Sequence, residues 1–311
     1  AFRANGVTVV VLSLDLGRVP AELVMTRIRQ RAGKAGVDYV FMSATHTHHA
    51  PVMELADAPY MPEIERALGD AVEEAFARLQ PVRIALGRTR FDIGHNRRKI
   101  LEDGRCFMLW RNEQREPTEP VDQEATLIKI ETIHGEPVAV LVHFACHPVV
   151  MGPSNLQYSA DYVGEVARIV KDRWGGECVF LQGACGDINP YLDKTRIEDG
   201  AVEAMRRVGQ ECADKTLEAL AAIQAAIPEK SSVVFSEKRI RVGTRWDLSN
   251  PRNREFLSNV HGWMFELYAE GLGPDLKVPL SVVLLNRQIA LVGMPGEIFV
   301  QFQLDLKRNS P

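Results

Sequence analysis

The stretch that decides the fold lies near the amino end of the chain and reads Val37-Asp38-Tyr39-Val40-Phe41-Met42-Ser43-Ala44-Thr45-His46-Thr47-His48-His49-Ala50-Pro51. It begins as a mostly apolar run of strand length and continues directly into a polar segment rich in histidine. In open α/β sheets, ligands bind outside the carboxyl ends of the strands, because loops converge there. We therefore expect this junction to lie at a functional site.

Apolar runs of strand length alternate along the chain with stretches of helical period. This alternation predicts an α/β fold with a mixed, largely parallel sheet flanked by helices and an active site at the carboxyl ends of the strands. Strands are expected at residues 7–14, 37–42, 83–87, 126–130, 138–144, 177–181, 233–242, 282–285 and 289–292. Helices are expected at residues 20–31, 62–79, 161–172 and 198–223.

No repeat or low-complexity tract divides the chain, so a single domain of residues 1–311 is expected. Residues 243–279 fit no element, and their glycines, prolines and aromatic side chains indicate a loop or a small subdomain over the site. Because the chain opens almost directly on an apolar run and stops after the first turns of a helix, we expect it to be truncated at both ends. A cytoplasmic location is slightly favoured, with secretion if a targeting segment precedes Ala1.

Composition excludes several classes of protein. With 311 residues, of which 46% are apolar and 25% charged, the chain can build a sizeable core and is neither disordered nor fibrous. A net charge of -4 and the absence of long basic runs argue against a nucleic-acid partner. Five cysteines without a CxxC pair predict free thiols, and no apolar stretch reaches the ~18 residues that a membrane span needs.

Two histidines of the opening stretch are candidates for metal binding. If the chain is still extended there, His46 and His48 point to the same side, because side chains alternate along a strand. Two imidazoles on one face can share a metal ion, or act as ligand and proton carrier. A polar surface turn that happens to contain histidines is the alternative, but the position directly after an apolar strand favours the functional interpretation.

A second cluster follows the strand at residues 138–144. His147 precedes a proline, which forces an extended or turn conformation, and it is the better ligand candidate of this cluster. His143 lies inside the apolar run and is expected to be a core histidine. Cys146 lies between these two histidines in the sequence.

Two further strand ends carry polar residues. Asp187 and Asn189 follow the strand at residues 177–181 in a glycine-containing loop, where a structural Asx-turn explains them as well as a direct role does. Glu297 follows the strand at residues 289–292 and would by itself be a helix N-terminal acid. Together with His46 and His147 it completes a set of two histidines and one carboxylate, which suits a catalytic Zn²⁺ with an open position for water.

These landmarks resemble, in order, those of the catalytic domain of the neutral/alkaline (non-lysosomal) ceramidase family. The similarity runs through nearly the whole chain and rests on Thr45-His46-Thr47-His48-His49-Ala50-Pro51, Asn96-Arg97, the His147 loop, Ser159-Ala160-Asp161, Gly186-Asp187-Ile188-Asn189-Pro190 and Pro295-Gly296-Glu297. The chain looks like a divergent ceramidase-like relative. In that family, zinc activates a water that attacks the amide carbonyl of ceramide and releases sphingosine and a fatty acid.

The resemblance implies roles for individual residues. His46, His147 and Glu297 resemble the zinc ligands, whereas His48 and Arg97 resemble the catalytic groups that orient the water or stabilise the carbonyl oxygen.

A second group of residues is expected around these. Asp187 is expected among the catalytic residues, and Asn96 and Asn189 are expected to bind the substrate.

The sequence departs from the family pattern at three points. Asn189 stands where the family has a serine with an assigned catalytic role, which argues for direct attack by water and against a serine acyl-enzyme. His49 stands where the family has another serine. The tyrosine that is a zinc ligand of the family would lie beyond Pro311.

The sequence therefore predicts a zinc-dependent hydrolase that cleaves an amide (N-acyl) bond of a small-molecule or lipid-like substrate, with ceramide as one candidate. The alternatives are an esterase or lactonase that uses the same metal site, and a noncatalytic carbohydrate- or lipid-binding relative, which Asn189 would support. A cysteine-dependent enzyme that uses Cys185 or Cys146 is a third alternative. The sequence does not determine the oligomeric state.

Overall fold

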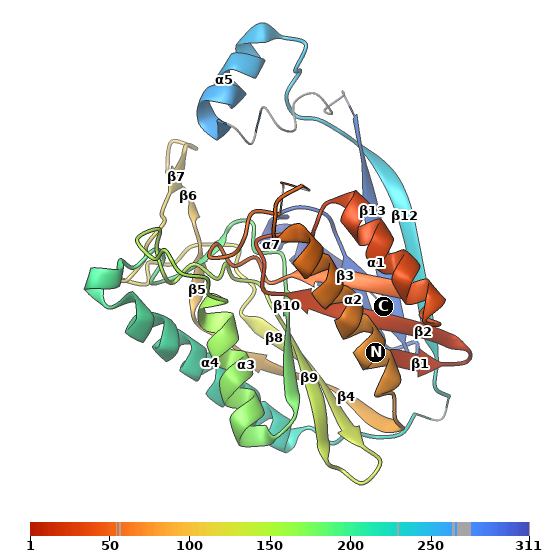
Figure 1. Cartoon of the computed structure of the whole chain (residues 1–311). Coiled ribbons are helices and arrows are strands. Elements are labelled where there is room, and N and C mark those ends of the chain that lie inside the picture. Colours follow the sequence, from red (N-terminus) through yellow and green to blue (C-terminus); the bar gives the residue numbers. More distant parts are fainter. Residues whose placement is uncertain (54, 56, 229, 263–264, 266–274, 311) are drawn as a thin grey trace.

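The structure is a computed structural model that describes residues 1–311 except 54, 56, 229, 263–264, 266–274 and 311 (Figure 1). Its first sheet has the order β1-β2-β3, formed by β1 (Phe2–Ala4), β2 (Val7–Leu14) and β3 (Tyr39–Ala44). The second has the order β10-β9-β8-β4, formed by β10 (Glu177–Gln182), β9 (Pro137–Phe144), β8 (Glu124–Thr132) and β4 (Val82–Arg90). The third has the order β12-β13-β14, formed by β12 (Val233–Gly243), β13 (Asp275–Leu285) and β14 (Ile289–Gly293).

Two small pairings complete the strand structure. β5 (Gly94–Asn96) pairs with β11 (Ile188–Pro190), and β6 (Arg98–Ile100) pairs with β7 (Cys106–Met108). The helices are α1 (Glu22–Lys34), α2 (Met61–Ala77), α3 (Asp161–Trp174), α4 (Ala201–Ala222), α5 (Pro251–His261) and α7 (Val300–Asn309), with a 3-10 turn at Ile197–Asp199. Each strand and helix expected from the sequence is present, with boundaries shifted by at most a few residues except at β13, which begins at Asp275 where residue 282 was expected.

The prediction of one largely parallel sheet is wrong, because the strands form several separate sheets and most of the strand pairs are antiparallel. Only β2 with β3 and β9 with β10 are parallel among the named strands. β13 and β14 are antiparallel, since Asn286 and Arg287 both adopt positive φ (53° and 58°) and close a tight hairpin between them. A turn of this kind reverses the chain at once, so no helical crossover intervenes.

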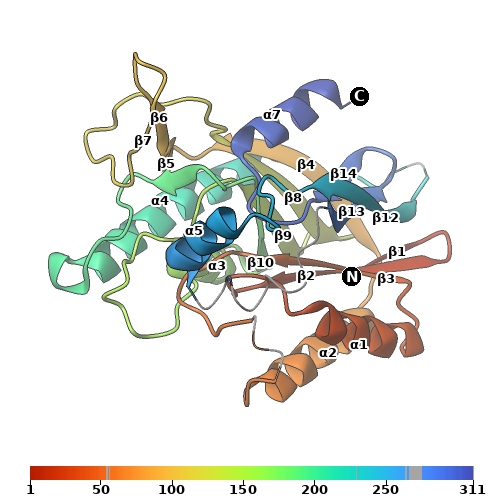
Figure 2. The same ribbon diagram turned by 90° about the horizontal axis from the view of Figure 1, so that it is seen from above.

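Helices cover the outer faces of two of the sheets (Figures 1 and 2). α1 and α2 pack on the first sheet around Val10, Leu12 and Ile28. α3 and α4 pack on the second sheet in a core whose members include Val140, Val142, Phe144, Tyr162 and Cys212.

The alternate side chains of the same strands are buried as well. Val9, Leu141 and Leu181 belong to a core cluster that also takes in Val283 of the third sheet. The strands at the centre of the fold are therefore buried on both faces, which explains why they read in the sequence as continuous apolar runs.

The segment 243–279 contains α5, which stands apart from the sheets at the top of Figure 1. β12 and β13 form the long hairpin that leads to it. Residues 263–264 and 266–274 of this segment lie outside the described part of the chain, so its predicted position over the site stays a prediction. Among the residues described, no helix combines the length and the apolar character that crossing a membrane requires.

The core around the second sheet makes a stability prediction. Phe144 is 1% exposed and packs edge-on against Phe91, with ring centroids 5.0 Å apart. We expect Phe144→Ala to lower the free energy of unfolding by about 3–5 kcal/mol in a urea titration, because it leaves a cavity. Phe107 is 52% exposed. Phe107→Ala should change the free energy of unfolding by about 0.5 kcal/mol at most, and equal losses in the two variants would contradict the assigned core.

Candidate metal centre

Three imidazoles meet beyond the carboxyl ends of two strands. His46 and His48 follow β3, His147 follows β9, and their ligand atoms all lie within 4.8 Å of one another. The ring centroids are 4.9 Å apart for His46 and His48, 4.9 Å for His46 and His147, and 5.6 Å for His48 and His147. These three histidines form a group that can hold a metal ion.

The carboxylate of Glu297 faces two of these rings from the junction between β14 and α7. Its Oε1 lies 3.2 Å from Nε2 of His46, and its Oε2 lies 3.4 Å from Nε2 of His147. Hydrogen bonds from His147 and His46 hold the pKa of Glu297 well below its usual range. The structure thus brings His46, His147 and Glu297 together as a cluster of two imidazole nitrogens and one carboxylate.

In both His46 and His147, a backbone carbonyl holds the ring nitrogen that faces away from Glu297. Nδ1 of His46 lies 2.5 Å from the carbonyl oxygen of Gly17, and Nδ1 of His147 lies 3.0 Å from that of Ile188. Because a carbonyl oxygen only accepts, each Nδ1 carries a proton, and each Nε2, which faces the carboxylate of Glu297, is the ring nitrogen left to bind a metal ion. A second hydrogen bond of this kind is what orients histidines in metal sites.

His46 reaches the centre from an unexpected backbone conformation. β3 ends at Ala44, and His46 has φ of 68°, so the chain is not extended there and the strand alternation assumed for His46 and His48 is wrong. The turn is held because the amide of Thr45 donates to the carbonyl of Leu14 and that of His46 donates to the carbonyl of Leu16. Backbone strain of this kind occurs where the surroundings enforce it, commonly at functional sites.

Protonation differs between the imidazoles. His48 is the most exposed of the three, yet its pKa is lowered to about 3, first by desolvation beside the cluster and then by the charges of His46 and His147. Burial acts to lower the pKa of His46, but the hydrogen bond and the charge of Glu297 outweigh it and raise that pKa. His48 is therefore neutral near pH 7, and its Nε2 lies 3.4 Å from that of His46.

The loop after β10 packs against the Glu297 segment backbone to backbone. The amide of Gly186 donates to the carbonyl of Ile298 at 2.9 Å. A Cβ on Gly186 would lie 2.3 Å from the carbonyl oxygen of Glu297 and 2.8 Å from that of Ile298. Only glycine permits this approach, which sets where Glu297 stands.

The structure places Asp187 and Asn96 in the support behind the cluster. Asp187 is 2% exposed, its Oδ2 accepts from Nδ2 of Asn96 at 3.0 Å, and its Oδ1 accepts from the amide of Val300 at 2.8 Å. Because Val300 is the first residue of α7, this carboxylate satisfies an unpaired amide at a helix start. A catalytic role for Asp187 and a substrate contact for Asn96 stay predictions.

Arg97 and Asn189 are joined to each other. The guanidinium of Arg97 donates to the carbonyl of Gly186 at 2.7 Å and to Oδ1 of Asn189 at 3.2 Å. Asn189 is fully buried and donates from Nδ2 to Asp193 at 2.9 Å. Both the oxygen and the nitrogen of its side-chain amide are thus bonded to other protein groups. A contact between Asn189 and the substrate stays a prediction.

Sequence reasoning missed the two carbonyls that orient the imidazoles and the side chains of Trp110 and Lys194 nearby. Gly17 lies shortly after β2, which ends at Leu14. The expectation that functional groups follow the carboxyl ends of strands therefore also applied to Gly17. Trp110 and Lys194 follow short or irregular segments that carry no periodic signal. His49, by contrast, turns its Nε2 to the carbonyl of Gly152 at 3.2 Å.

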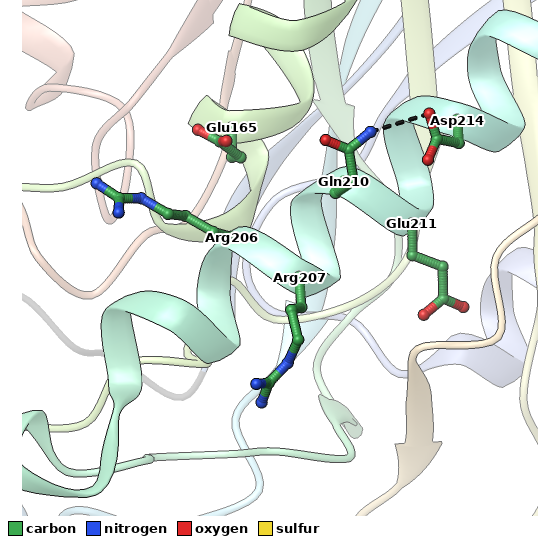
Figure 3. Close-up of a pocket in the computed structure, with 6 residues that line it drawn as sticks. All are labelled: Glu165, Arg206, Arg207, Gln210, Glu211 and Asp214. Atoms are coloured by element: carbon green, nitrogen blue, oxygen red, sulfur yellow. Dashed lines mark hydrogen bonds between the residues drawn. The ribbon is translucent and has the colours of Figure 1, made fainter.

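A cavity of about 1100 Å³ opens beside His46 and Glu297. Its apolar lining includes Phe41, Ile128, Leu141, Leu181, Leu291 and Leu306. His143 also lines it and is half-buried, so it lies on the wall of the cavity and not in the core as expected; burial lowers the pKa of this histidine to about 4. A separate, shallow hollow on α3 and α4 contains none of the cluster residues and is lined by Glu165, Arg206, Arg207, Gln210, Glu211 and Asp214 (Figure 3).

These features define an α/β protein with a group of three histidines at its strand ends that could hold a metal ion. The fold is similar to that of the neutral ceramidase from Pseudomonas aeruginosa, with a TM-score of 0.69 and 17% sequence identity over 96% of this chain and 56% of that chain. A solved ceramidase complexed with C2 gives a TM-score of 0.69 and 17% identity, covering 96% of this chain and 57% of that one. The chain thus has a ceramidase-like fold and spans somewhat more than half the length of these proteins. No protein-family model and no curated protein sequence matches it.

The close approach at Gly186 gives a prediction for this site. We expect Gly186→Ala to push Glu297 away from the imidazoles and to weaken zinc binding by about 10–100-fold in a competition titration with a chelator, since supporting contacts commonly contribute that much. Gly33 lies in α1, and a Cβ there would meet nothing within 4 Å. Gly33→Ala should leave zinc affinity unchanged, and undiminished affinity in Gly186→Ala would refute the role of this contact.

Proposed function

We propose that the protein is a zinc-dependent hydrolase that cleaves an amide (N-acyl) bond by direct attack of water, with His46, His147 and Glu297 as the zinc ligands. One observation carries the proposal. Nε2 of His46 and Nε2 of His147 face the two oxygens of the Glu297 carboxylate at 3.2 and 3.4 Å, while both Nδ1 atoms are held by backbone carbonyls.

The donor set fits the proposed metal. Two histidines and one carboxylate are a ligand set of catalytic zinc sites, which keep a further position open. When bound, Zn²⁺ supplies Lewis acidity, lowering the pKa of a coordinated water to ~7 and polarising a carbonyl oxygen. The ceramidase-like fold supports an amide as the bond that is cleaved.

The remaining residues of the proposed mechanism orient groups and hold protons. His48 is neutral near pH 7, so it can accept a hydrogen bond from the attacking water at a ring nitrogen. Arg97, fixed by Gly186 and Asn189, supplies positive charge for the oxygen of the scissile carbonyl as negative charge develops on it.

Two buried residues have supporting parts in this proposal. Asn189 acts as a positioning residue for Arg97, and because it has no hydroxyl it cannot form an acyl-enzyme. Asp187 acts as a positioning residue for α7 and hence for the segment that carries Glu297.

The cavity supports a lipid-like substrate. Its apolar lining starts beside His46 and Glu297, and its volume of about 1100 Å³ has room for an extended acyl chain. Ceramide is one candidate, and cleavage of esters or lactones at the same site would use the same groups. A panel of N-acyl amines, esters and lactones distinguishes these substrates from one another and from a noncatalytic binding role.

The ligand assignment gives the first test. We expect the wild-type protein to retain about one equivalent of zinc and to show chelator-sensitive hydrolysis of a member of that panel, and His46→Ala to lose both, because a ligand is removed. His134 is exposed on the turn between β8 and β9 and is the matched control. His134→Ala should keep zinc content and activity, as measured by elemental analysis and amine release, whereas full zinc content in His46→Ala would refute the assignment.

The cysteine alternative gives the second test. Burial raises the pKa of the Cys146 and Cys185 thiols well above the usual range, which disfavours the nucleophilic thiolate. We therefore expect Cys185→Ala and Cys146→Ala to keep at least about half of the wild-type kcat/KM, measured with the same substrate. A loss of about 1000-fold in either variant, with zinc retained, would favour a cysteine-dependent enzyme instead.

A further inference from the structure

A cationic and aromatic cluster lies beside the metal centre and has no part in the mechanism above, apart from Arg97. Trp110 is 45% exposed. The guanidinium carbon of Arg97 lies 5.0 Å from the centroid of its ring, and Nζ of Lys194 lies 4.3 Å from it. We call Arg97, Trp110 and Lys194 the mouth cluster.

The backbone fixes Lys194 close to the metal ligands. The amide of Lys194 donates to the carbonyl of Val149 at 2.8 Å, and Val149 is two residues from His147. The next amide, that of Thr195, donates to the carbonyl of Val150 at 2.8 Å.

The mouth cluster carries an uncompensated positive charge. Lys194 pairs with Asp193, whose side chain is buried and also accepts from Asn189. Arg97 donates only to the neutral oxygens of Gly186 and Asn189, and no carboxylate within the described ranges lies at ion-pair distance from it. Two cations and one carboxylate leave a net charge of about +1 beside an exposed indole ring.

We propose that Lys194 and Trp110 recognise a carboxylate that the substrate carries near its scissile amide, so that N-acyl amino acids are preferred over uncharged N-acyl amines. This inference rests on the proposed function and specifies the substrate class of the same site. The carboxylate would neutralise the charge of the mouth cluster, and the indole would pack against the apolar atoms that join it to the amide. An uncharged substrate would leave the charge uncompensated.

The test measures binding without turnover. N-dodecylsulfonylglycine and N-dodecylsulfonylglycinamide differ at one group, a charged carboxylate in the first and an uncharged carboxamide in the second, and their sulfonamide bond resists hydrolysis. We expect the zinc-loaded protein to bind the carboxylate probe about tenfold more tightly than the amide probe by isothermal titration calorimetry, the scale of one partly exposed charged hydrogen bond. Equal dissociation constants in the wild-type protein, or no binding of either probe, would overturn the proposal.

Variants of Lys194 test whether this residue causes the preference for the carboxylate probe. Lys194→Met should reduce the ratio of the two dissociation constants to about twofold or less, whereas Lys194→Arg, which keeps the charge, should retain most of it. Lys171 pairs with Glu177 on the surface, and Lys171→Met should keep the full ratio. A full ratio in Lys194→Met would overturn the assignment, and the zinc content of the same preparations reports on the proposed function separately.

Discussion

The contact between Gly186 and the backbone of Glu297 and Ile298 is the constraint on which the site depends. It joins the loop after β10 to the junction between β14 and α7, two segments more than 100 residues apart in the sequence. The buried carboxylate of Asp187 adds a second tie to the same junction through the first amide of α7. Together these bonds place Glu297 opposite His46 and His147. His46 follows β3 of the first sheet, and His147 follows β9 of the second.

The sequence located the elements of the fold better than their arrangement. Strands buried on both faces, such as β9, read as apolar runs because no face is solvated. The order and direction of strands depended instead on local turn geometry, such as the positive φ at Asn286 and Arg287, which an alternation of apolar and polar residues does not reveal. That is why one largely parallel sheet was expected where several mixed sheets occur.

The candidate site divides in a similar way. Residue type and position after a strand pointed to His46, His147 and Glu297, and the structure brings these three side chains together, while their role as metal ligands stays a prediction. Residue type and position did not indicate that His46 would adopt a left-handed backbone conformation with φ of 68°. Nor did they indicate that Asp187 and Asn189 would be buried and hydrogen-bonded to other protein groups. Such contacts join segments distant in the sequence, as Asn189 does by linking Arg97 to Asp193 and, through it, to Lys194.

The central claim is that His46, His147 and Glu297 share one zinc ion, and the coordination shell of that ion tests it most directly. X-ray absorption spectroscopy at the zinc edge on the purified wild-type protein should show about one zinc per chain, with two imidazole nitrogens and carboxylate or water oxygens at about 2.0–2.2 Å. A shell containing sulfur at about 2.3 Å, or a protein that retains no zinc after purification in its presence, would contradict the account.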